Sequence, residues 1–438
     1  LSQLGVETGA VLADLLLGKS VPSGKLTTTW AAVKDYPAVG DFGCRDDTRY
    51  REGIYVGYRY FDSVGVTPLF PFGFGLSYTS FSLSEEKAFV EGETIRVEAL
   101  LKNTGKMPGR EVLQLYVSKP EVCLDHPFQE LAAFQKSEEL PPDGEQTVSL
   151  TFRMSEIASY DTGRACYILE KGDYFLRLGF SSDDTHAVAR LRLEEEVIIR
   201  QVKNVCGVTD FSDWKPKLER IDMLLPDVPV YTVDAESLPR STADYRLETE
   251  TEDVVRTLDD EQLISMNLGA YDPKSILPSV IGSAAFRVAG AAGETSAVTE
   301  KLGIMPLVMA DGPAGLRLSR DYVMKDGVPS SLGMTIPETV AAMLPGPVRS
   351  LLTNSGRKGK AGTETLHQYA TAIPIGTAVA QSWNTAFART CGDIVGDEME
   401  RLNVDIWLAP GMSARRKSRR RGSSTTSFRT EPSRSIAS

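Results

Sequence analysis

Hydrophobic and polar residues alternate with a period of two through much of the stretch 79–200. The alternation is clearest at 95–101, 113–117, 148–152 and 174–178, and glycine-containing turn sequences separate these runs. A period of two places every second side chain on one face of a strand, so each run predicts a strand with one buried face. Several short strands joined by turns favour an all-β sandwich, which we assign to residues 79–200.

The pattern changes to mixed helix and strand periods over residues 251–412. Asp259 followed by Gln262 is a capping-box pattern, which predicts a helix start. Apolar residues at near-helical spacing over 387–402 predict a second helix, and the short apolar runs 306–310 and 404–409 predict strands. Strands that alternate with helices are typical of α/β folds, so this region predicts the first units of a (β/α) barrel.

Residues 1–78 show a third pattern. An apolar segment ends at Gly18, as expected for a helix with a glycine C-cap, and 25–30 predicts a strand. We interpret 1–78 as part of an α/β sandwich domain. The aromatic-rich remainder is expected to pack between domains, although Glu7, Glu52 and Arg59 could contact a ligand. The fold class is therefore multidomain α/β plus all-β.

Asp311 is the candidate functional residue, because it directly follows the predicted buried strand 306–310. Parallel strands in α/β folds present their carboxyl ends to ligands, and a carboxylate there can accept hydrogen bonds from ligand hydroxyls. The alternative is that Asp311 only caps the following Gly-Pro turn through its own backbone.

Composition narrows the function classes. The 438 residues are 42% hydrophobic and 24% charged, and no apolar run approaches the roughly 18 residues of a membrane span. Five widely spaced cysteines favour a reducing, cytoplasmic environment, and three scattered histidines argue against a metal site. The net charge of −11 argues against nucleic acid as a partner.

Two segments lie outside the predicted domains. Residues 201–250 are polar, lack sustained periodicity and are interpreted as a connector. Residues 413–438 contain eight serines and eight basic residues, so this tail cannot form a core by itself. We interpret the tail as the product of a shifted reading frame; a genuine basic tail that binds nucleic acid or anionic lipid is the alternative.

The motif Asp311-Gly-Pro-Ala-Gly-Leu-Arg317 resembles the D-G-P-x-G-x-R signature of glycoside hydrolase family 3, the β-glucosidase family. The stretches 290–295, 371–376, 381–384 and 404–411 resemble further parts of the family's barrel, and 1–78 resembles the end of its α/β sandwich domain. Residues 79–200 are similar to its fibronectin type III domain, for which we expect a structural role rather than sugar binding. The domain order is similar to that of a circularly exchanged branch of the family.

The resemblance implies a retaining hydrolase of small β-glycosides that needs no cofactor and acts alone or as a homo-oligomer. Asp311 would bind sugar hydroxyls in the glycone subsite, with Arg317 ordering its loop. The nucleophilic aspartate and the acid/base glutamate are expected outside this chain, which would then be an inactive fragment. Ser212-Asp213-Trp214 matches the family's short nucleophile motif but lies in the connector, so we expect no catalytic role. A non-catalytic carbohydrate-binding protein or scaffold is the alternative.

Overall fold

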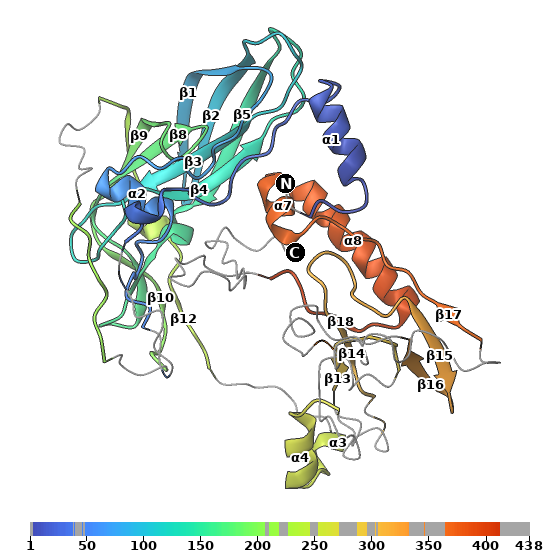
Figure 1. Cartoon of the computed structure of the whole chain (residues 1–438). Helices are drawn as coiled ribbons and strands as arrows, with labels where there is room; N and C mark the ends of the chain where they lie inside the picture. Colours follow the sequence, from blue (N-terminus) through green and yellow to red (C-terminus); the bar gives the residue numbers. More distant parts are fainter. Residues whose placement is uncertain are drawn as a thin grey trace. The chain divides into compact units, whose positions relative to one another are not determined.

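The computed structural model describes residues 3–37, 39, 46, 49–205, 210–218, 227–245, 253–270, 287–295, 303, 305–332, 346 and 364–411. They form two compact units. Figure 1 labels their helices and strands along the chain. The β-sandwich unit comprises the described parts of 11–246 together with Ala380–Asn384. The Asp311 unit comprises the described residues up to Ala10, those of 247–379, and Thr385–Gly411.

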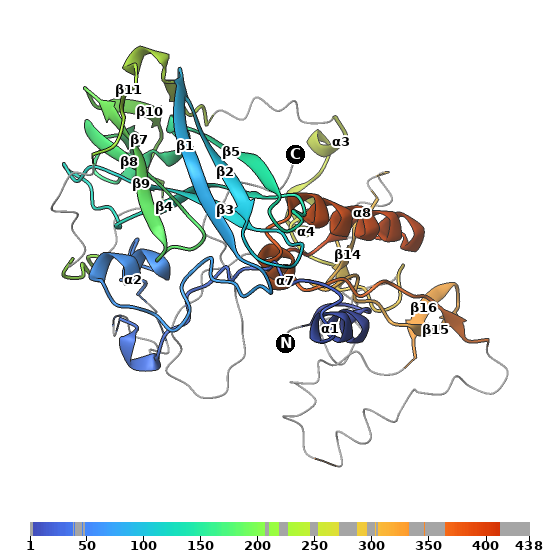
Figure 2. The ribbon, with the colours of Figure 1, turned by 90° about the horizontal axis from the view of Figure 1, so that it is seen from above.

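Two layers, antiparallel except for one parallel strand pair at an edge, build the β-sandwich, and Figure 2 shows them from above. One layer has the strand order β1-β2-β5, and the other has the order β11-β9-β8-β3-β4. Every second residue points inward, so the runs predicted to form one face are buried. The strands are β1 (Phe81–Glu91), β2 (Thr94–Asn103), β3 (Val112–Ser118), β4 (Glu130–Lys136), β5 (Glu145–Arg153), β8 (Gly172–Gly179), β9 (Thr185–Leu193) and β11 (Val230–Thr232).

A third, four-stranded sheet has the order β12-β10-β7-β6. Its strands are β6 (Ser159–Asp161), β7 (Cys166–Leu169), β10 (Val197–Gln201) and β12 (Ser241–Thr242). Strands β11 and β12 come from the segment interpreted as a connector. Strand β11 has three residues and β12 has two, which is too short for a period to be visible in the sequence. Each adds to the edge of an existing sheet, β11 beside β9 and β12 beside β10.

Strand β3 is buried on both faces, which its alternation did not predict. Tyr116 faces away from the sandwich core, and its ring packs edge-on against Tyr58 of helix α2 (Tyr58–Val64) at 5.8 Å between centroids. The Tyr58 hydroxyl accepts a hydrogen bond from Leu131 N of β4. The aromatic segment after residue 49 therefore covers the outer face of this sheet, and Arg59 pairs with Glu130 at 3.0 Å.

The N-terminal part agrees with the predicted helix but not with the predicted strand. Helix α1 (Thr8–Leu16) is followed by Gly18 in a left-handed conformation, with φ of +68°. The segment 25–30 is not a strand of a sheet. It pairs irregularly with 70–74 through an isolated bridge between Trp30 and Phe70. A strand needs a hydrogen-bonded neighbour along its whole length, whereas 25–30 is hydrogen-bonded to 70–74 only near its two ends. The short helix η1 (Val33–Asp35) follows.

The Asp311 unit contains two small sheets beside helix α8 (Thr385–Leu402). The first has the order β13-β14-β18, in which β14 and β18 are parallel. The second is antiparallel with the order β16-β15-β17. The remaining elements are β13 (Gly293–Glu294), β14 (Val308–Ala310), β15 (Asp321–Lys325), β16 (Val328–Ser331), β17 (Leu366–His367), β18 (Ile406–Trp407), α3 (Asp253–Arg256), α4 (Asp260–Met266) and α7 (Gly376–Gln381).

The two helix predictions for this unit are confirmed, whereas the predicted strands 306–310 and 404–409 are shorter than expected, at Val308–Ala310 and Ile406–Trp407. The Asp259 carboxylate accepts a hydrogen bond from Gln262 N, while the Gln262 side chain accepts one from Asp259 N, so the capping box is present at the start of α4. Helix α8 covers the predicted span 387–402. The tail 413–438 lies outside the described residues. Among the described helices, none is long and apolar enough to cross a membrane.

Candidate functional site

Asp311 immediately follows β14, whose residues Val308 and Ala310 are buried. Ala310 is paired in parallel with Trp407 of β18, so both strands end at the same edge of the sheet. Helix α8 precedes β18 and carries Cys391 and Val395 into the same small core. The side chain of Asp311 is 41% exposed, which leaves its carboxylate accessible at the carboxyl edge of two parallel strands.

Two glycines allow the chain after Asp311 to fold into a very tight loop. Gly312 and Gly315 have φ of +127° and +106°, which L side chains rarely adopt. A Cβ atom on Gly312 would lie 2.0 Å from the carbonyl oxygen of Gly315, and one on Gly315 would lie 2.1 Å from that of Thr371. The loop closes where Arg317 N donates a hydrogen bond to the carbonyl oxygen of Asp311 at 2.8 Å. The glycines in the motif are therefore steric requirements.

Two residues of the β18 segment hold this strand and loop in place, and sequence reasoning assigned neither of them a role. The Trp407 indole donates a hydrogen bond from Nε1 to the carbonyl oxygen of Gly312 at 2.8 Å. Asp405 Oδ2 accepts one from Val308 N at 2.7 Å, at the opposite end of β14. The signal in the sequence was the presence of an aspartate and a tryptophan within a short run predicted to form a strand.

Glu398 of α8 supports the loop from a second direction. Its carboxylate accepts hydrogen bonds from Thr371 N at 2.9 Å and from the Thr371 hydroxyl at 2.5 Å. Thr371 in turn contributes the carbonyl oxygen that excludes any side chain at Gly315. The position of Asp311 is thus fixed by backbone and polar contacts from several segments.

The Asp311 carboxylate has a weak internal partner. Arg317 Nη1 lies 3.8 Å from Asp311 Oδ2, and the Arg317 side chain is 56% exposed. Ion pairs at such a distance and exposure contribute little to stability. The carboxylate oxygens are therefore free to accept hydrogen bonds from hydroxyl groups of a ligand, and the guanidinium lies close enough to contact the same ligand.

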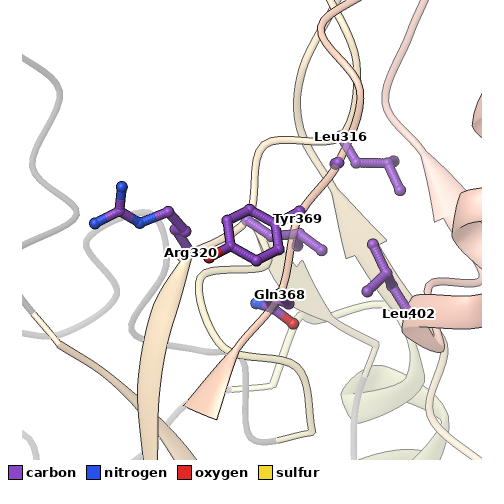
Figure 3. Close-up of a pocket in the computed structure, with 7 residues that line it drawn as sticks. Leu316, Arg320, Gln368, Tyr369 and Leu402 are labelled. Atoms are coloured by element: carbon purple, nitrogen blue, oxygen red, sulfur yellow. The ribbon is translucent and has the colours of Figure 1, made fainter. Parts of the chain in front are cut away.

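A cavity of about 210 Å³ also lies in this unit, but Asp311 does not line it (Figure 3). Its walls include Leu316, Tyr369 and Leu402, and the guanidinium of Arg320 points away from the two leucines. Hydrogen bonds from Arg320 and then from His367 hold the pKa of the Asp321 carboxylate at about 2. The charged groups beside the cavity are thus already paired with one another.

Asp213 lies in the β-sandwich unit rather than in the Asp311 unit. The backbone of Trp214 donates a hydrogen bond to Arg51 O at 2.6 Å, and its ring contacts Tyr60. The Asp213 carboxylate lies against Gly53, where an added Cβ atom would come within 2.7 Å of it. This segment packs along the chain after residue 49 as a structural strap.

The other residues considered as ligand groups are dispersed. Glu7 is exposed just before α1, Glu52 is buried in the β-sandwich unit, and Arg59 forms its ion pair with Glu130. The described part of the chain contains no group of three or more histidine, cysteine, aspartate or glutamate side chains that could hold a metal ion. Asp311 and its loop are therefore the site that the geometry supports best.

Comparisons with known proteins show which protein family the chain resembles. Residues 2–78 match the glycosyl hydrolase family 3 C-terminal domain, and residues 111–182 match the fibronectin type III-like domain. Together with the alignment of 94% of the chain to a β-glucosidase, these matches make the chain similar to members of glycoside hydrolase family 3.

The relatives are β-glucosidases. Beta-glucosidase A of Butyrivibrio fibrisolvens is 30% identical over 475 residues, covering 94% of this chain and 50% of the relative. The beta-glucosidase of Ruminococcus albus is 30% identical over 440 residues, covering 94% of this chain and 40% of the relative. The solved beta-glucosidase from Paenibacillus barengoltzii is 28% identical with a TM-score of 0.65, covering 92% of this chain and 42% of that one. The chain thus spans half or less of these relatives.

Proposed function

We propose that this chain provides the glycone-binding strand end of a hydrolase that cleaves O-glycosyl bonds of β-glucosides or related small glycosides. The observation that carries the proposal is the exposed Asp311 carboxylate, which a glycine-dependent loop holds at the carboxyl edge of parallel strands. The similarity of the chain to a β-glucosidase over 94% of the chain's length supports the choice of substrate class.

The proposal includes the first units of a (β/α) barrel for residues 251–412. Strands β14 and β18 are parallel neighbours, and helices α7 and α8 lie between them in the sequence. A strand, a helical crossover and a parallel strand form the repeating unit of such barrels. Barrel enzymes bind substrates at the carboxyl ends of their strands, which is where Asp311 lies.

Asp311 is assigned binding rather than bond cleavage. Retaining glycosidases need two carboxyl groups about 5–5.5 Å apart, one acting as nucleophile and the other as acid and base. We assign neither role to a residue of this chain, because Asp213 packs in the strap and Asp311 follows the first parallel strand of its sheet. A carbohydrate-binding protein without catalytic activity is the second candidate. The assignment of neither catalytic role to a residue of this chain favours it.

Glucose binding tests the assigned role of Asp311. In saturation-transfer NMR of the purified chain, glucose signals should respond in the wild type and disappear in Asp311→Asn, which removes the charge with little change of shape. Asp326→Asn is the matched control, because Asp326 lies in an exposed turn of the β15–β16 hairpin and asparagine tolerates its φ of +51°. Equal signals in wild type and Asp311→Asn would refute the assignment.

Hydrolysis tests the division between binding and cleavage. The purified chain is expected to release no chromophore from an aryl β-glucoside above the buffer rate, because a positioned nucleophile and acid provide much of the barrier reduction in retaining enzymes. Turnover that disappears in Asp213→Ala would identify Asp213 as the nucleophile. Turnover that survives that change but disappears in Asp311→Ala would show a site of a different design.

A further inference from the structure

A row of exposed side chains crosses the four-stranded sheet of the β-sandwich unit. Tyr160 of β6 lies directly opposite Tyr167 of β7, Tyr167 lies opposite Arg200 of β10, and Arg200 is in register with Ser241 of β12. Residues paired in register point to the same face of a sheet. All four residues are exposed. Their chain neighbours are buried: Cys166 and Ile168 on either side of Tyr167, and Ile199 before Arg200. The row therefore lies on the solvent face.

The two tyrosines form one aromatic surface. Their ring centroids are 5.2 Å apart and their planes are inclined by 48°, so the two rings do not lie in one plane. Tyr160 is 36% exposed and Tyr167 is 41% exposed. Two neighbouring aromatic rings that stay accessible offer an apolar surface against which a ligand can stack. Two rings inclined to each other suit a single ligand chain that rests across both of them, not a flat crystalline surface.

The polar end of the row offers hydrogen-bond donors. Arg200 is exposed and forms no ion pair among the described residues, and the Ser241 hydroxyl makes only a long hydrogen bond, 3.3 Å, to Ile199 O. Adjacent strands are about 4.8 Å apart, so the four positions extend over roughly 14 Å. This length accommodates a few sugar rings, whose apolar faces would contact the tyrosines while their hydroxyls contact Arg200 and Ser241.

The charges around the row favour a neutral ligand. Arg164 is held between Asp161 at 2.6 Å and Glu196 at 2.5 Å, so its charge is satisfied locally. These three groups and Arg200 together carry no net charge. An anionic or cationic polymer would gain little here, whereas a neutral hydroxylated chain loses nothing by electrostatics. Within the row itself, the exposed apolar area consists of two partly exposed tyrosine rings, which is small for a protein interface.

We infer that this row, named the Tyr160 row, is an accessory binding site for a single chain of a neutral β-linked glycan. The choice of a β-linked glycan rests on the proposed function. The Tyr160 row lies in the β-sandwich unit and Asp311 in the other, so the accessory site is separate from the glycone site. It would hold an oligosaccharide or polysaccharide substrate without taking part in bond cleavage.

Affinity gel electrophoresis of the whole chain tests the inference. Soluble mixed-linkage β-glucan in the gel should retard the wild type, and Tyr160→Ala/Tyr167→Ala should weaken binding by about tenfold or more, because two stacking contacts are lost. Tyr160→Phe/Tyr167→Phe keeps both rings and should retain most of the retardation. Arg200→Ala should weaken binding by about threefold through the loss of one hydrogen-bonding group.

The matched control is Tyr369→Ala, which removes a tyrosine that is 71% exposed in the Asp311 unit and should leave retardation unchanged. Circular dichroism of every variant verifies folding, and the phenylalanine pair keeps the test decisive if the alanine pair does not fold. Three results would overturn the inference: no retardation of the wild type, retardation by dextran sulfate alone, or undiminished retardation of a folded alanine pair.

A protein ligand is the competing explanation. Sedimentation of the wild type as a dimer that the alanine pair converts to a monomer, with no response to glycan, would assign the row to a protein interface and overturn the inference. Failure of glucose binding at Asp311 leaves the gel result unaffected, since electrophoretic retardation depends on the Tyr160 row alone. The glycone site at Asp311 and the accessory site at the Tyr160 row can therefore be refuted independently of each other.

Discussion

Among the described residues, the β-sandwich core contains 25 buried hydrophobic residues in one cluster, whereas the cluster behind Asp311 contains nine. The sandwich strands run for up to 11 residues, but β14 has three and β18 has two. The sandwich is therefore stabilised mainly by apolar burial. The Asp311 loop depends on a few polar contacts and on glycines that permit close backbone approach. Substitutions should consequently affect stability most in the first region and site geometry most in the second.

The largest effect is expected for Trp383→Ala, which removes a side chain that belongs to the β-sandwich unit although its flanking helices lie mainly in the other unit. The Trp383 ring packs edge-on against Phe134 at 4.9 Å and Phe72 at 5.5 Å, and Nε1 donates to Lys25 O. Its loss should lower the free energy of unfolding by about 3–5 kcal/mol.

Urea unfolding monitored by hydrogen exchange of the β4 peptides measures the effect of Trp383→Ala. The control is Leu76→Ala at a side chain that is 74% exposed, with an expected change within about 0.5 kcal/mol. Equal effects of the two substitutions would show that Trp383 does not contribute to the sandwich unit.

The second effect concerns Glu130, which is paired with Lys119 and Arg59. Burial alone would raise the pKa of Glu130, but the two cations outweigh it and lower the pKa from 4.5 to about 2. Because the folded pKa lies below the unfolded one, the stabilisation is present above pH 4.5 and is lost as pH falls towards 2. Glu130→Gln should therefore cost on the order of 3 kcal/mol at pH 7.

Free energies of unfolding at a series of pH values measure this dependence. The difference between wild type and Glu130→Gln should narrow steadily below pH 4.5. Glu145→Gln is the comparison, because the Glu145 ion pair with Lys102 is exposed to solvent and should contribute little to stability at any pH. A difference that stays constant down to pH 3 would contradict the assigned ion-pair origin.

A moderate effect is expected at the Asp311 loop. Gly315→Ala would place a Cβ atom 2.1 Å from the Thr371 carbonyl oxygen at a φ of +106°, so the loop must shift, at a cost of about 1–3 kcal/mol. Hydrogen exchange in peptides covering 308–317 should accelerate, and glucose binding should weaken. Gly392→Ala in helix α8 meets no atom within 4 Å and should instead stabilise the helix by up to about 1 kcal/mol. Equal responses would refute the steric account.

The smallest effect on stability is expected for Arg317→Ala. Its guanidinium is 3.8 Å from the Asp311 carboxylate and more than half exposed, so the free energy of unfolding should change by less than about 1 kcal/mol. Thermal unfolding provides the measurement, and the same samples give the glucose response. A large loss of stability would show that the ion pair, rather than the backbone contacts, holds the loop.

Local sequence signals predicted the elements that depend on neighbouring residues. The Asp259 and Gln262 capping box, the span of helix α8 and the inward faces of the sandwich strands all agree with the structure. Each depends on contacts within a few residues or on a simple period. Segment 25–30 was wrongly predicted as a strand, because a strand also requires a continuous partner, which its own residues do not reveal.

By itself, the sequence determined the alternating core of the sandwich, the helix ends and the position of Asp311 directly after an apolar run. Only the tertiary structure decided that β3 is covered on both faces, that Trp383 packs in the β-sandwich unit and that Trp407 holds the carbonyl group of Gly312. It also aligned Tyr160, Tyr167, Arg200 and Ser241 in one row. The physical reason is that these contacts join residues far apart in the chain, and strand register and packing, not local periodicity, choose the partner.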